Sequence, residues 1–297
     1  MDSLALACVL VSVVMHATWN IVLKTAGDPL RTATAGMISA LLVLAPAAAI
    51  GWLVLGRPAV PPQALAIGFL SGLAEIAYFV FLAAAYRRGD LSVVSPLARG
   101  SAPLLIVIVG VAVLGERLSP GAAVGVALIL VGLLTVQRPW RFLQGAHAAH
   151  RGAAGFALLT GLMIATYTSL DRVGSQLTPP WIYAAILWAV GAAGLGLVDL
   201  ARPRLAGGAF AAGPDTLNLR TAVLAGMLTL GAYTLILFAL SRAEVAIVGP
   251  LRESSVLITS AYGVARLREA VTGREVTLRL AGSALVLLGA AVLAAAG

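Results

Sequence analysis

The chain has 297 residues, of which 60% are hydrophobic and 11% charged, and its mean hydropathy is +0.99. Soluble domains are about 45–50% apolar and about 25% charged, so this composition excludes an ordinary soluble domain and indicates an integral membrane protein. The formal net charge is +8, but the basic residues stand singly between apolar runs, which excludes a groove for nucleic acid; the lone Cys8 excludes a disulfide framework.

Ten apolar runs are long enough to cross a bilayer, which needs roughly 20 residues per helix. The first run follows Met1-Asp2-Ser3 and lacks the basic start of a signal peptide, so we expect a retained helix. The predicted fold class is therefore an all-α integral membrane protein with ten transmembrane helices. The predicted spans are 4–24, 32–55, 64–86, 91–114, 120–137, 153–171, 179–199, 219–240, 244–266 and 277–296.

One of the two long polar connections divides the chain into halves. We predict a first repeat over 1–137, a linker over 138–152 and a second repeat over 153–297. His147 and His150 in this linker have no carboxylate or thiol near them in sequence, so we assign them no metal.

The two halves contain similar stretches. DLSVVSPLARGS at 90–101 resembles EVAIVGPLRESS at 244–255, with Pro96 level with Pro250 and Arg99 level with Arg252. MHATW at 15–19 also resembles MIATY at 163–167, and LGE at 114–116 resembles LRE at 267–269. Five spans per half place the copies in opposite orientations, so we predict two inverted five-helix repeats, a design typical of secondary transporters.

The basic residues are distributed unevenly between the two faces of the membrane. Connections after even-numbered spans carry only Arg57, Arg117, Arg172 and Arg242. By the positive-inside rule, the more basic odd-numbered connections lie in the cytoplasm and both termini lie outside. The residues on the basic side are Lys24, Arg31, Arg87, Arg88, Arg138, Arg141, Arg151, Arg202, Arg204, Arg220, Arg266, Arg268, Arg274 and Arg279.

Several motifs together resemble one transporter family. HATWN at 16–20, LGERLS at 114–119, PLARG at 96–100 and PLRESS at 250–255 are similar to those of EamA-type permeases of the drug/metabolite transporter superfamily, in a subgroup partly associated with phosphonate utilisation. The resemblance covers nearly the whole chain and implies ten helices around a central cavity between the repeats. It leaves the side of the termini open, because related nucleotide-sugar carriers are thought to keep both termini in the cytosol. Two departures stand out: Arg268 replaces the glycine of the second Gly-Glu turn, and Glu75 stands where that subgroup often has histidine.

Two arginines inside apolar spans are the strongest site candidates. An arginine at the centre of a membrane helix costs roughly 2.5 kcal/mol or more, so something must offset it. Arg99 shares a helical stripe with Ser95 beside Pro96, and Arg252 shares one with Ser255 beside Pro250. Guanidinium groups bind carboxylate or phosphate through paired hydrogen bonds, which favours an anionic or zwitterionic solute. The alternative is that Arg99 and Glu253 pair as a structural bridge, leaving Arg252 for substrate.

Other polar residues inside spans complete the predicted cavity. Glu75, followed by Tyr78, lies mid-span, where desolvation disfavours the charged form of a carboxyl, so it is a candidate proton carrier or a neutralising partner of Arg99 or His16. His16 and Asn20 share a face of the first helix, and we expect Tyr167 and Asp171 of the sixth to line the same cavity. Trp52, Trp140, Trp181 and Trp188 are predicted to be interfacial or packing aromatics.

The function predicted from these features is secondary transport of a small polar, anionic or zwitterionic metabolite across the inner membrane by alternating access. The alternative is an intramembrane enzyme acting on lipid phosphates, but the sequence contains no HExxH, GxSxG or phosphate-loop motif. The expected partners are the lipid bilayer, a small-molecule substrate and a coupling proton, with no cofactor, metal or nucleic acid. The expected state is a monomer or homodimer.

Overall fold

The structure is a computed structural model that describes residues 1–24, 28–88, 91–138, 148–201, 217–265 and 272–296. All elements in these ranges are helices. In the first half they are α1 (Ser3–Lys24), α2 (Pro29–Val54), α3 (Pro62–Arg88), α4 (Leu91–Ala112) and α5 (Pro120–Gln137). In the second half they are α7 (Ala148–Leu177), α8 (Pro180–Ala201), α9 (Leu219–Arg242), α10 (Val245–Glu253), α11 (Ser255–Ala265) and α12 (Gly273–Ala296).

The prediction of an all-helical membrane protein is confirmed. With α10 and α11 counted as one broken pass, the described residues form ten helical passes, and eight of the helices are long and apolar enough to span a bilayer. Their outward faces carry large apolar side chains that are mostly exposed, such as Leu42, Val54 and Leu200. A soluble protein rarely exposes apolar surface on this scale, whereas lipid covers it.

One predicted span was wrong as a single helix: the ninth, predicted over 244–266, is divided at Ser254 into α10 and α11. The sixth helix, Ala148–Leu177, is longer than its predicted span of 153–171 at both ends. The described helix starts follow local chemistry: Asp28, Ser119 and Asn218 accept hydrogen bonds from backbone amides in the first turns of α2, α5 and α9. Proline is the first residue of α2, α3, α5 and α8 because its missing N–H costs nothing there.

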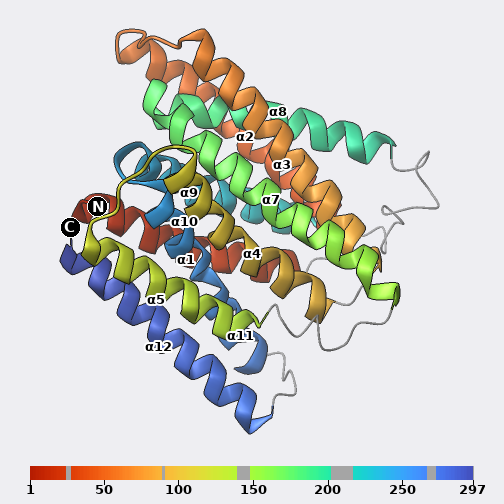
Figure 1. Ribbon diagram of the computed structural model, residues 1–297. Coiled ribbons are helices and arrows are strands. Elements are labelled where there is room, and N and C mark those ends of the chain that lie inside the picture. The colour runs from red at the N-terminus through yellow and green to blue at the C-terminus, as the bar shows by residue number, and fades with distance from the viewer. Residues whose placement is uncertain (25–27, 89–90, 139–147, 202–216, 266–271, 297) are drawn as a thin grey trace.

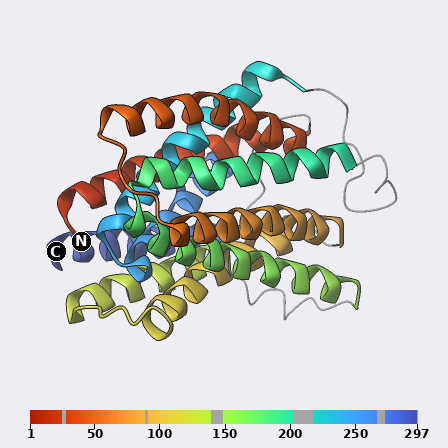
Figure 2. The same cartoon turned by 90° about the horizontal axis from the view of Figure 1, so that it is seen from above.

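The helices of the two halves alternate in space. The main neighbours of α1, α3 and α5 are α9, α7 and α12, all from the other half, and α2 packs on both α8 and α9. Figure 1 shows α5 and α12 side by side at one edge of the bundle. Both chain ends lie at the same end of the bundle (Figures 1 and 2). We call the end that carries the start of α1 and the end of α12 the termini side, and the opposite end the basic side.

Glycines bring helices of the two halves into backbone contact. A Cβ added to Gly132 of α5 would lie 2.6 Å from the carbonyl oxygen of Gly282 in α12, and one added to Gly289 would lie 2.6 Å from that of Gly125. Because 132 pairs with 282 and 125 with 289, α5 and α12 run antiparallel. A Cβ at Gly36 of α2 would likewise lie 2.8 Å from the carbonyl oxygen of Ala222 in α9. Small residues permit this approach in a membrane.

Candidate functional site

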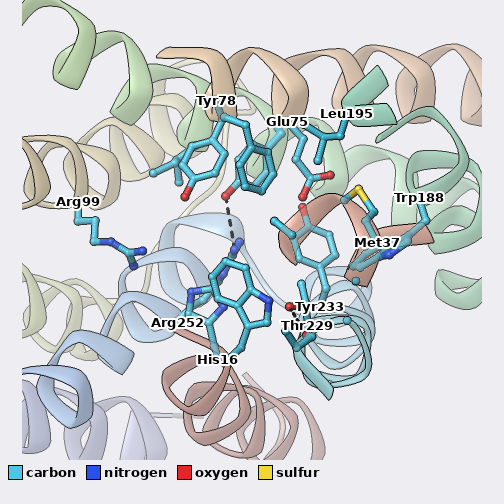
Figure 3. A pocket seen from close by; sticks show the side chains of 18 of the residues that line it. His16, Met37, Glu75, Tyr78, Arg99, Trp188, Leu195, Thr229, Tyr233 and Arg252 are labelled. Carbon is cyan, nitrogen blue, oxygen red and sulfur yellow. Dashed lines mark hydrogen bonds between the residues drawn. The ribbon is translucent and has the colours of Figure 1, made fainter. Parts of the chain in front are cut away.

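A pocket lies between the two halves, on the basic side of the bundle centre. Its empty space, including the part open to solvent, is about 760 Å³. Its walls come from the later parts of α1, α3 and α8, the early parts of α2 and α9, the middle of α4 and α7, and the end of α10. Figure 3 shows Arg99 on the left of this pocket and Glu75, Met37 and Trp188 on the right.

The break between α10 and α11 places two charged residues in this pocket. Pro250 lies inside α10 and has no N–H to donate, and the next turn closes tightly, with the amide of Ser254 donating to the carbonyl of Leu251 at 3.2 Å. The helix therefore ends at Arg252 and Glu253, which both line the pocket although they are only 5% and 4% exposed. Irregular backbone at membrane depth is tolerated where it borders a cavity, and it often forms a binding site there.

Arg252 lies against two tyrosine rings. Its guanidinium carbon is 5.2 Å from the ring centre of Tyr233 and 5.8 Å from that of Tyr167. Its Nη2 donates to the Tyr167 hydroxyl at 3.4 Å, the contact dashed in Figure 3. Its buried Nη1 has no hydrogen-bond partner among the described residues. The rings hold the guanidinium in place and leave a donor for an anion.

Two carboxyl groups in the pocket also have buried oxygens without a hydrogen-bond partner in the described part of the chain. These are Oε2 of Glu75 and Oε2 of Glu253. Glu75 lies beside Met37 and Gly191, both apolar: a Cβ added to Gly191 would be 3.0 Å from the Met37 sulfur and 3.6 Å from Glu75 Oε2. The pocket therefore offers acceptors as well as a donor, which matches a solute that carries both charges.

Arg99 is held by the first helix. Its Nη2 donates to Asn20 Oδ1 at 2.9 Å, and Asn20 Nδ2 donates to the backbone carbonyl of His16 at 2.7 Å. The His16 ring stacks on Trp19 with 5.7 Å between ring centres. Arg99 and Arg252 thus line one pocket, the first carried on α4 and oriented by α1.

A third buried acid, Asp171 of α7, lies beside the pocket and connects four helices. Its Oδ1 accepts from the hydroxyls of Ser71 at 2.5 Å and Tyr183 at 3.0 Å, and its Oδ2 accepts from the hydroxyl of Tyr233. Tyr233 presents its ring to Arg252. Asp171 therefore orients Tyr233, and through it the wall on which Arg252 rests.

The predicted site residues fall into three groups. His16, Glu75, Tyr78, Arg99, Tyr167, Arg252 and Glu253 line the pocket. Asn20 lies behind it and orients Arg99, while Pro250 and Ser255 are buried on either side of the break without lining the pocket. The side chains of Ser95 and Pro96 lie outside the described residues. The binding roles of all these residues stay predictions.

Sequence reasoning missed several walls of the pocket. Trp188, predicted as an interfacial or packing residue, packs edge-on against Tyr233 with 5.3 Å between ring centres and lines the pocket. Tyr233, Met37 and Thr229 were not singled out, although Tyr233 is one of the few polar aromatics inside a span. Asp171 was expected in the cavity wall but lies one layer behind it. Within the described residues, no three His, Cys, Asp or Glu side chains form a group that could hold a metal ion.

Comparisons with known proteins agree with this architecture. The sequence model of the EamA-like transporter family matches residues 3–137. One similar solved structure is described only as the crystal structure of a protein. The match covers 98% of this chain and 96% of the other chain, with a TM-score of 0.69 and 20% sequence identity. The two proteins therefore share a fold. No curated protein sequence matches.

Proposed function

We propose, starting from the EamA-like transporter domain in residues 3–137, that the whole chain is a secondary transporter of a small polar metabolite. The family match implies a membrane transporter, and it favours transport over the alternative of an intramembrane enzyme. The inner membrane is the proposed location, as the sequence predicts.

The substrate that the pocket fits best is zwitterionic, with an anionic group facing Arg252. The single observation that carries this proposal is the buried Nη1 of Arg252, which lacks a partner among the described residues at a depth where an unsatisfied charge is costly. A carboxylate, phosphate or phosphonate oxygen bound there would offset that cost. A cationic group on the same solute would satisfy the Glu253 carboxylate, next to Arg252 in the chain.

Alternating access by two inverted repeats is the proposed mechanism. It is supported by the antiparallel pairing of α5 with α12, the last helix of each half. Reciprocal neighbours also support it. The pair of α3 and α7 corresponds to the pair of α9 and α1, and the pair of α2 and α9 corresponds to the pair of α8 and α3; all four pairs are in contact. Exchange of the two halves maps each of these pairs onto another, as a twofold relation requires. A cavity between such repeats is where transporters place their substrate.

Glu75 is the proposed proton carrier. Its buried Oε2 has no hydrogen-bond partner among the described residues, and its neighbours Met37 and Gly191 are apolar. A cationic group entering the pocket would favour ionisation, so substrate binding and proton release would be coupled.

The anion site is tested first by finding a ligand. A thermal-shift screen of purified protein against amino acids, aminophosphonates, simple carboxylates and simple amines should give the largest increase in melting temperature with compounds that carry both charges. A screen in which simple amines act alone would contradict an anion site at Arg252.

The role of Arg252 is then tested by substitution. Arg252→Gln should weaken binding of the best ligand by about tenfold or more, because a buried charge-assisted pair is lost. Arg252→Lys, which keeps the charge but not the planar fork, is the matched control and should bind with intermediate affinity. If Arg252→Gln is folded and binds as well as the unmodified protein, the anion lies elsewhere.

A further inference from the structure

The corner between α9 and α10, on the termini side, is held by a carboxylate from the other half of the chain. Glu116 accepts from the backbone amides of Val245 at 2.7 Å and Ala246 at 2.9 Å. These are the first two amides of α10, and the first amides of a helix have no partner within it. A carboxylate at that position is favoured both by the two bonds and by the helix dipole.

Arg172 completes this corner from α7. Its Nε lies 3.4 Å from Glu116 Oε1, and its Nη1 donates to the carbonyl of Leu240 in the last turn of α9. The end of α9 is therefore bound by the Arg172 cation and the start of α10 by the Glu116 carboxylate, and these two side chains contact each other. Three segments from the two halves meet at Glu116.

Local backbone geometry places Glu116 for this contact. Gly115 has φ of +68°, which favours glycine, and the amide of Glu116 donates back to the carbonyl of Gly110 at 3.0 Å. A Cβ added to Gly110 would lie 2.6 Å from Glu116 Oε2 and 3.1 Å from both Ala246 Cβ and Val245 Cγ1. Gly110 thus leaves the space that the carboxylate occupies.

We propose that Glu116 is a positioning residue of the transport cycle, which holds the pocket closed on the termini side and must release the start of α10 for the pocket to open there. The proposal rests on the proposed transport function. It follows from the length of α10, only nine residues from Val245 to Glu253. One end of this short helix is bound by Glu116, and the other carries Arg252 and Glu253 in the pocket. A shift at either end therefore moves the other.

A second contact on the same side is weaker. Arg242, at the end of α9, donates to Asp2 Oδ2 at 2.7 Å, but both side chains are more than 40% exposed. The Ala5 amide, and after it Arg242, hold the pKa of Asp2 below its ordinary value. Exposed ion pairs contribute little to stability because water screens them. The Glu116 side chain is only 7% exposed, so it is the contact whose loss should matter.

The test measures from which side of the membrane a pocket cysteine can be reached. Thr229→Cys places a thiol in the pocket wall, and Val245→Cys places one beside Glu116; both are made in a Cys8→Ser background, since Cys8 is the only native cysteine. A membrane-impermeant maleimide is applied to right-side-out cells and to inside-out vesicles. A cysteine appended after Gly297 reports which preparation exposes the termini side.

We expect the Thr229→Cys thiol to react from the basic side when Glu116 is intact. Glu116→Ala should raise its reaction rate from the termini side by about tenfold or more, the population shift expected when a charge-assisted contact is lost. Gly110→Ala should act in the same direction although residue 116 is still a glutamate, because the added methyl displaces the Glu116 carboxylate. The isosteric Glu116→Gln should have a smaller effect.

Glu275→Ala is the matched control. It removes a glutamate that pairs with Arg138 at 2.9 Å, joining the end of α5 to the start of α12 on the basic side. It should leave the labelling of Thr229→Cys from the termini side unchanged. Each variant is first checked for a monodisperse peak in size-exclusion chromatography, and Gly110→Ala or Glu116→Gln replaces Glu116→Ala if that variant does not fold.

Three outcomes would overturn the inference. If Val245→Cys becomes reactive but the pocket thiol keeps its sidedness, Glu116 is only a local helix cap. If Glu275→Ala has the same effect as Glu116→Ala, the change reflects general loosening. If Thr229→Cys is unreactive from both sides in every variant, the pocket is not an access path, and that result contradicts the proposed transport function as well.

Discussion

Asp171 shows how a buried charge can be stabilised without a cation in hydrogen-bond contact. Its three described partners are hydroxyl groups, from Ser71, Tyr183 and Tyr233, and each donates to the carboxylate. Hydrogen bonds to an ionised acceptor are roughly twice as strong as neutral ones. The same three bonds connect α7 to α3, α8 and α9, so this single side chain contributes to the packing of four helices.

Asp171→Ala should therefore destabilise the protein strongly. Each hydroxyl left buried without an acceptor costs about 1–3 kcal/mol, so three of them should cost several kcal/mol. We expect a large fall in the melting temperature of the detergent-solubilised protein, or loss of folded yield. Asp171→Asn keeps one acceptor oxygen, so its melting temperature should lie between those of Asp171→Ala and the unmodified protein. Ser71→Ala, which removes one donor, should lower the melting temperature least. Equal melting temperatures for Asp171→Ala and Ser71→Ala would contradict this account.

For individual residues, the sequence shows which polar side chains lie within apolar spans, but it does not show which of them contact one another. Arg99 and Arg252 could be chosen because a charge inside a span needs a reason. That Asn20 orients Arg99, or that Glu116 caps α10, depends on contacts between segments 79 and 129 residues apart. Periodicity reports only one helix at a time, and it contains no information on such contacts.

The element most altered from its prediction is the ninth span. Apolar residues dominate 244–266 on both sides of Arg252 and Glu253, so the sequence predicts one helix. The break lies at Ser254, four residues after the proline, where the chain closes a tighter turn. The other spans were predictable because a bilayer requires long apolar helices whatever their neighbours are.

Close packing of α5 and α12 gives a prediction for these two helices. Gly132→Val should lower the melting temperature and the folded yield, because its side chain would collide with the backbone of Gly282 and with Val286. Overpacking of this kind costs about 1–3 kcal/mol or more when backbone must move. Gly155→Val is the matched control, since a Cβ there meets nothing within 4 Å. A similar loss in both variants would show that glycine matters for another reason.

For the molecule as a whole, the distribution of arginine predicts orientation. The described arginines on the basic side include Arg31, Arg88, Arg138 and Arg220, and the positive-inside rule places that side in the cytoplasm. Reporter fusions after Gly297 should then be active only when the reporter functions outside the cytoplasm. The pocket, which lies toward the basic side, would be reached from the cytoplasm in this conformation. A fusion active only in the cytoplasm would reverse both statements.

The alternation of helices from the two halves has a consequence for what counts as a domain here. The principal partners of α1, α3 and α5 all come from the other half, and the paired glycines of α5 and α12 leave no room for lipid between these helices. A half of the chain on its own would leave these faces uncovered. We therefore expect that neither half folds on its own and that the smallest cooperative unit is the assembly of all ten helical passes.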